Sequence, residues 1–187
     1  MRLAACLILS LVAMSGTAFA AGWVQLPTSA VKPSDVVIPD GEQLGQFRRI
    51  IQPFKNWILI CDESLKTKRR VCNLTQSIVD TQGAPIFNWS FVATASGEPL
   101  VVMRVPAAVG PGQQIGLALG SRPDRIVAET DQCDAAFCTA TIAIGPMLRR
   151  HIRAGTDCLV SYQRPDFGEV RLDAPLDGLY AALAALK

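Results

Sequence analysis

From Trp57 onward, hydrophobic and polar residues of the chain tend to alternate with a period of two. The clearest case is residues 87–93, where Phe87, Trp89 and Phe91 are separated by polar residues. Residues 115–119 and 138–144 follow the same pattern. Successive side chains of a strand point to opposite faces of a sheet, so this alternation predicts strands with one buried face.

Glycine and proline separate these segments at residues 83–85, 97–99, 110–112 and 122–124. Short strands between such turn signals are typical of antiparallel sandwiches and barrels. Two short helices are expected at Pro146–Ala154 and Gly178–Leu186. We therefore predict an all-β fold, an antiparallel β-sandwich or barrel-like arrangement, with one or two short helices that include a C-terminal one.

The first twenty residues have the three parts of a secretory signal peptide. Arg2 is followed by an apolar run, Leu3–Ala13, and by the small-residue cleavage motif Ala18–Ala20. The apolar run is too short to cross a hydrocarbon layer, which needs ~20 residues. We expect cleavage after Ala20 and a mature protein in the periplasm, secreted or on the outer surface.

The remaining residues divide into a leader and one domain. Residues 21–45 contain Pro27, Pro33 and Pro39 without apolar periodicity, which predicts an extended leader. Residues 41–55 are mixed, and we interpret them as a segment that approaches the domain and can contribute a strand. The chain of 187 residues then holds a single β-rich domain over residues 46–187.

Composition and charge exclude several classes of function. Half of the residues are apolar, 18% are charged and the formal net charge is +2, so neither a disordered chain nor a nucleic-acid partner is expected. The chain has one histidine, His151, which argues against histidine-rich metal sites. We expect no cofactor and no metal.

Five cysteines follow the expected cleavage site, and their spacing predicts two disulfides. A hairpin would bring Cys61 to Cys72, and a tight loop would bring Cys133 to Cys138, with stabilisation of ~3 and ~2 kcal/mol. Cys158 would remain a buried free thiol. A redox-labile bridge and a metal site are the alternatives, although the chain lacks a Cys-x-x-Cys motif and zinc-ribbon spacing.

Three basic clusters are the candidate binding residues. They are Arg48–Arg49, the 66–70 cluster (Lys66, Lys68, Arg69 and Arg70) and the 149–153 cluster (Arg149, Arg150 and Arg153). If they converge, they form a face for lipid phosphates, glycans or an acidic partner. If they stay apart, they are ordinary solvated loops. His151 lies within the third cluster and is expected to be a surface histidine on a short basic helix.

The order of motifs from Trp57 to the end resembles the invasion-associated locus B family of small exported bacterial proteins. The matching segments are Trp57–Asp62, Cys72–Gln76, Arg104–Pro106, Gln114–Leu119, the Cys133 and Cys138 pair, and Pro175–Leu179 before an Ala-Leu helix. The resemblance implies a periplasmic or outer-surface β domain. It also implies a link to entry into host cells through the founding members, and it brings no catalytic residues.

These observations favour a non-enzymatic, exported β-sandwich that binds a protein or an anionic component of the envelope or a host surface. The 66–70 and 149–153 clusters are the expected contact residues, presented on loops and a helix of a rigid scaffold. One alternative is an envelope enzyme, a hydrolase or thiol-dependent, that uses His151 or Cys158. Another is an accessory subunit of an envelope complex.

Overall fold

The structure, a computed structural model, describes residues 34, 36–93, 97–121 and 124–186. The expected signal peptide and most of the expected leader lie outside the described residues. The chain divides into two compact units, 1–37 and 38–187, and all strands and helices described here belong to the second.

The larger of two sheets has seven strands, and every neighbouring pair is antiparallel. In spatial order the strands are β1 (Phe47–Phe54), β2 (Trp57–Ser64), β3 (Arg70–Val79), β4 (Pro85–Ala93), β5 (Pro99–Pro106), β9 (Phe137–Ala143) and β8 (Gln132–Cys133). The first five strands follow one another along the chain, so this part of the sheet is a simple meander.

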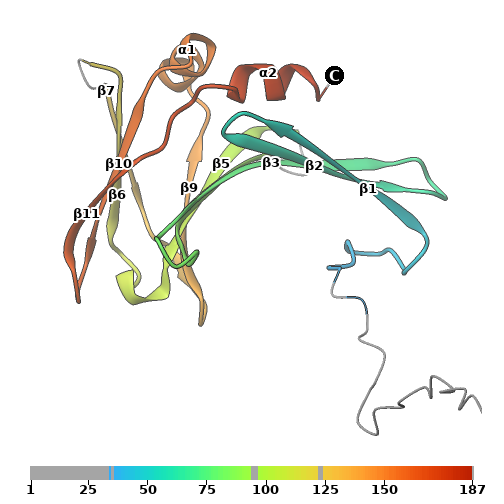
Figure 1. Cartoon of the computed structure of the whole chain (residues 1–187), viewed down its shortest axis with the longest axis horizontal. Helices are drawn as coiled ribbons and strands as arrows, with labels where there is room; N and C mark the ends of the chain where they lie inside the picture. The colour runs from blue at the N-terminus through green and yellow to red at the C-terminus, as the bar shows by residue number, and fades with distance from the viewer. Residues whose placement is uncertain (1–33, 35, 94–96, 122–123, 187) are drawn as a thin grey trace, which may run out of the picture. The chain divides into compact units, whose positions relative to one another are not determined.

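The second sheet has four strands, again all antiparallel. Its spatial order is β11 (Gly168–Asp173), β10 (Cys158–Arg164), β6 (Gln114–Leu119) and β7 (Asp124–Glu129). A short 3-10 helix, η1 (Ala107–Val109), connects β5 toward β6. Two α-helices, α1 (Pro146–Ala154) and α2 (Leu179–Ala184), contact each other: α1 lies at one end of the four-stranded sheet, and α2 lies over the seven-stranded sheet, where it contacts β1 and β2 (Figure 1). The predicted β-sandwich-like fold with a C-terminal helix is confirmed.

The core lies where the apolar faces of the strands meet, each strand having apolar and polar residues in alternation. Trp57, Trp89 and Phe91 are packed with ring centroids 5.3–6.0 Å apart, within the range of favourable aromatic pairs. Gln76, only 6% exposed, accepts a hydrogen bond from the Trp89 indole at 2.9 Å and donates one to the Pro175 carbonyl at 3.1 Å. This amide therefore joins the segment before α2 to the seven-stranded sheet.

Strand β1 forms the outer edge of the seven-stranded sheet. It pairs with β2 through a two-residue turn, Lys55–Asn56, in which Lys55 has a φ of 40°. Pro53 lies within the strand, and an edge tolerates it because a proline has no N–H to donate to a second neighbour. The mixed pattern of this segment follows from its position, since most of its side chains are exposed.

Candidate functional site

Helix α1 is held by one apolar face. Leu148 and Ile152, one turn apart, are 1% and 3% exposed. Pro146 begins the helix, where its missing N–H costs nothing, and Gly155 ends it in the left-handed conformation. Because the core takes Leu148 and Ile152, Arg149, Arg150 and Arg153 are carried on the exposed surface of the helix.

A groove of about 240 Å³ runs between α1 and α2, and we call it the α1–α2 groove. Its lining comes from both helices and from the ends of β5 and β9: Pro99, Ile144, Arg149, Ile152, Arg153, Tyr180, Leu183 and Ala184. A wider hollow of about 520 Å³ lies over α1 itself and shares Arg149 and Arg153 with the groove. These two arginines therefore stand between an apolar recess and an open, basic surface.

The three arginines of α1 differ in their partners. Arg150 donates to the Asp124 carboxylate at 2.6 Å. Arg149 donates from Nε to the Ile144 carbonyl at 3.0 Å, which fixes its stem without neutralising its charge. Among the described residues, no carboxylate lies within ion-pair distance of Arg149 or Arg153. Two uncompensated guanidinium groups thus remain at the rim of the groove, available to an anion.

The sequence-based expectation of a solvated surface histidine at position 151 is wrong. The His151 side chain is only 12% exposed, because it lies on the side of α1 that faces the start of β7 and the approach to β10. Its Nε2 is 3.0 Å from Asp124 Oδ2 and its Nδ1 is 3.0 Å from Thr156 Oγ1. Since a carboxylate only accepts, Nε2 carries the proton, and in the neutral ring Nδ1 accepts from the threonine hydroxyl.

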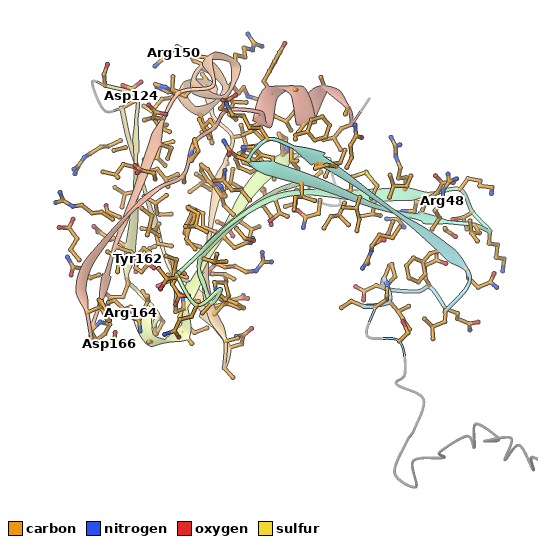
Figure 2. All side chains as sticks on the ribbon, viewed as in Figure 1. Arg48, Asp124, Arg150, Tyr162, Arg164 and Asp166 are labelled. Carbon is orange, nitrogen blue, oxygen red and sulfur yellow. A yellow bond between two sulfur atoms is a disulfide. The ribbon has the colours of Figure 1, made fainter. Side chains whose placement is uncertain are left out.

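Asp124 is the centre of this cluster. Hydrogen bonds from His151 and then from Arg150 hold the pKa of the Asp124 carboxyl below its ordinary value. The cluster ties α1 to the first residue of β7 and, through Thr156, to the segment that enters β10. Figure 2 shows Asp124 and Arg150 beside each other at the α1 end of the four-stranded sheet.

Cys158 is a buried free thiol with 2% exposure. Desolvation raises the pKa of this thiol to about 12. It is therefore protonated at neutral pH and shielded from solvent, the opposite of the exposed thiolate that nucleophilic catalysis uses.

The 66–70 cluster lies in the turn between β2 and β3 and at Arg70, the first residue of β3, and its side chains are exposed. The neighbouring Arg48 and Arg49 are paired with Glu63 at 2.9 Å and with Asp62 at 2.7 Å. Arg48 and Arg150 lie at opposite sides of the molecule in the view of Figure 2. The three basic clusters therefore do not form one surface: the first two share an end of the large sheet, and the 149–153 cluster is separate.

Both cysteine pairs form disulfides between neighbouring strands. Cys61–Cys72 links β2 to β3 and Cys133–Cys138 links β8 to β9, each at directly opposed positions. Within the described residues, no group of three or more His, Cys, Asp or Glu side chains is arranged to hold a metal ion. No helix in that part of the chain is long and apolar enough to span a membrane.

The sequence did not point to the groove as a unit. Tyr180 is 57% exposed within an otherwise apolar helix, and this aromatic residue was the one available signal. Ile144 and Pro99 carry no signal of their own, because their role depends on strand ends that meet only in the folded chain. Asp124 and Thr156 were likewise not distinguishable from other polar loop residues.

Comparison with known proteins gives a consistent result for the fold. The chain is similar to the crystal structure of invasion associated protein B from Bartonella henselae, with 20% sequence identity and a TM-score of 0.58 over 73% of this chain and 94% of that one. Comparison with curated proteins found no match. Neither the family of this structural neighbour nor the family whose model matches this chain is known as an enzyme family. The model of the invasion associated locus B (IalB) protein family matches residues 57–187, and the chain belongs to this family.

Proposed function

We propose that this protein is an exported, non-enzymatic binding protein that attaches to an anionic component of a cell surface, of the bacterial envelope or of a host. The observation that carries the proposal is the pair Arg149 and Arg153, whose charges no described carboxylate compensates. The exposed 66–70 cluster at the β2–β3 turn provides a second basic contact. Two separate basic contacts on one rigid scaffold suit an extended anionic surface.

Export is supported by two independent features. The first twenty residues have the pattern of a signal peptide, which predicts cleavage after Ala20. The two disulfides suit an oxidising compartment such as the periplasm or the cell exterior. Both features agree with residence outside the cytoplasm, where an anionic lipid or glycan surface is available.

A catalytic role for His151 is the second candidate. The order hydroxyl, imidazole, carboxylate in Thr156, His151 and Asp124 is the order of a nucleophile triad. Here, however, the same carboxylate oxygen also accepts from Arg150, and the imidazole connects three elements of the fold. A structural link explains these contacts without a reaction. Cys158 is no candidate nucleophile, because it is buried and protonated.

The test is sedimentation with vesicles of phosphatidylcholine that contain phosphatidylglycerol, at increasing salt. Each basic side chain near an anionic membrane contributes ~1 kcal/mol. Arg149→Glu with Arg153→Glu should therefore weaken binding by more than about 30-fold, and Lys66→Glu with Lys68→Glu should weaken it as well. High salt should release the protein from the vesicles.

Two matched variants separate the proposal from its alternatives. Arg125→Glu reverses an exposed charge on β7, outside both clusters, and should leave the salt-sensitive binding within about threefold of the parent. His151→Ala should also retain binding as long as the fold is intact. Binding that does not respond to salt, or that ignores the reversal of both clusters, would refute the electrostatic proposal. Loss of a measured hydrolytic activity in a folded His151→Ala variant would instead favour the enzyme.

A further inference from the structure

We infer that the α1–α2 groove binds an anionic amphiphile, a single apolar chain that ends in a phosphate or carboxylate. This inference rests on the proposed function and specifies the ligand class of one of its two basic contacts. The recess beside the 66–70 cluster, about 380 Å³ in volume, differs in its chemistry, because its lining is polar apart from one glycine and includes the carboxylate residue Glu42. The groove is therefore the place where an anionic surface component could be recognised by more than its charge.

The walls of the groove are apolar. Ile144 and Leu183 are half-buried, and Ile152 forms the buried floor. Pro99 and Ala184 complete the apolar lining. An apolar chain laid on these side chains would remove their exposed surface from water, which is the main driving force for burying hydrocarbon. A purely ionic ligand would leave this surface wet.

The rim of the groove is cationic. Arg149 and Arg153 are one helical turn apart and therefore project from the same side of α1. The hydrogen bond from Arg149 Nε to Ile144 holds that side chain in place, while its terminal nitrogens donate to no described residue. A guanidinium fork matches the oxygens of phosphate or carboxylate, and a preorganised one loses less entropy on binding.

Tyr180 forms the opposite wall, in the first turn of α2. It is 57% exposed, so its ring offers an apolar surface and its hydroxyl a further hydrogen bond near the entrance. This arrangement, with cations on one side and an amphipathic aromatic on the other, suits a ligand that changes from polar to apolar along its length.

The dimensions indicate a single chain rather than a bulky ligand. At about 240 Å³ the groove is smaller than the usual small-molecule site of roughly 300–1,000 Å³. The wider hollow over α1, which shares Arg149 and Arg153, leaves room for a headgroup outside the groove. The apolar chain would occupy the groove while the headgroup stays in contact with both arginines and with water.

The experiment is calorimetric titration of the purified protein with decyl phosphate below its micelle concentration. Decanol and inorganic phosphate carry the two halves of the ligand separately, and each should bind at least about tenfold more weakly than decyl phosphate. Arg149→Gln with Arg153→Gln should weaken decyl phosphate binding at least about tenfold and leave decanol binding unchanged. Ala184→Phe, which fills the groove from an exposed helix position, should abolish both. The matched control Arg125→Gln should change neither.

The outcomes separate this inference from the proposed function. If decyl phosphate does not bind, or binds equally well to a folded Ala184→Phe variant, the inference is overturned, while salt-sensitive vesicle binding that needs Arg149 and Arg153 would leave the proposed function standing. A dimer that Ala184→Phe dissociates would show that the groove is an interface between copies, and would also overturn it. If Ala184→Phe loses decyl phosphate binding, its vesicle binding identifies the natural source of the amphiphile. Loss of vesicle binding as well identifies a membrane lipid, and retained vesicle binding identifies a free amphiphile. Both results support the inference.

Discussion

Asp124 accepts hydrogen bonds from two consecutive residues of α1: from Arg150 at 2.6 Å and from His151 at 3.0 Å, both on Oδ2. The helix that carries the basic cluster is thereby fixed to the first residue of β7. The same helix forms one wall of the α1–α2 groove. The position of Arg149 and Arg153 thus depends on an ion pair on the other side of the helix, as well as on the apolar contacts of Leu148 and Ile152.

Asp124→Asn should lower the free energy of unfolding at neutral pH and reduce its dependence on acid. The pKa of Asp124 is lowered in the folded protein, while an unfolded aspartate has a pKa of ~3.9. The contribution of the Asp124 carboxylate to stability is therefore complete above pH ~3.9, and it is lost as the pH falls through the lower pKa that this group has in the folded protein. Urea unfolding from about pH 6 to pH 2 measures the difference between parent and variant, which should shrink with acid. A difference that stays constant over this range would contradict the prediction.

Gly178→Ala should destabilise the protein more than the same substitution at Gly83. Both glycines have a positive φ, 88° and 84°, so each alanine pays a conformational cost of ~1–2 kcal/mol. At position 178 the added Cβ would also lie 3.1 Å from the Phe54 carbonyl and 3.3 Å from Lys55 Cβ, whereas nothing lies within 4 Å at position 83. We expect a loss of ~2–4 kcal/mol for Gly178→Ala and of ~1–2 kcal/mol for Gly83→Ala in the free energy of unfolding measured with urea. Equal losses of unfolding free energy in the two variants would show that the β1–β2 hairpin, which carries Phe54 and Lys55, moves aside at no cost.

The parts of the fold that the sequence predicted are those with strong local patterns. Aromatic residues at every second position of 87–93 place one face of β4 in the core, and a strand requires that alternation. Helix α1 has the predicted bounds, because Pro146 marks its start and Gly155 follows its end. The Cys61–Cys72 disulfide was also predictable from local sequence, because two strands joined by a short polar turn form a hairpin. In the structure these two cysteines lie directly opposite each other on β2 and β3.

The parts that could not be predicted depend on distant residues. His151 is enclosed because its imidazole contacts Asp124, 27 residues earlier in the chain, and Thr156. The hydrophobic periodicity of the sequence does not predict such contacts. The neighbouring arginines suggested a solvated helix, yet only one side of that helix faces water. The groove requires strand ends and two helices to meet, so its residues are recognisable only together.

Gln76→Leu should lower the free energy of unfolding by ~2–4 kcal/mol. The substitution removes the acceptor of the Trp89 indole and the donor to the Pro175 carbonyl, and each buried polar group left without a partner costs ~1–3 kcal/mol. The added apolar burial offsets part of this cost. The neighbouring Ser77 is exposed, and Ser77→Ala should cost less than about 1 kcal/mol. Chemical unfolding followed by tryptophan fluorescence makes the comparison, and similar losses for both variants would show that the Gln76 link contributes little.

The five cysteines from Cys61 to Cys158 should react with an alkylating reagent in a fixed order. In the folded, unreduced protein none should be labelled, because four are in disulfides and Cys158 is buried with its pKa raised to about 12. Unfolding without reductant should expose Cys158 alone. Mild reduction of the folded protein should open Cys133–Cys138 before Cys61–Cys72, since Cys133 is exposed whereas Cys61 is 4% exposed. Mass spectrometry of the labelled peptides assigns each site, and labelling of Cys158 before unfolding would contradict its burial.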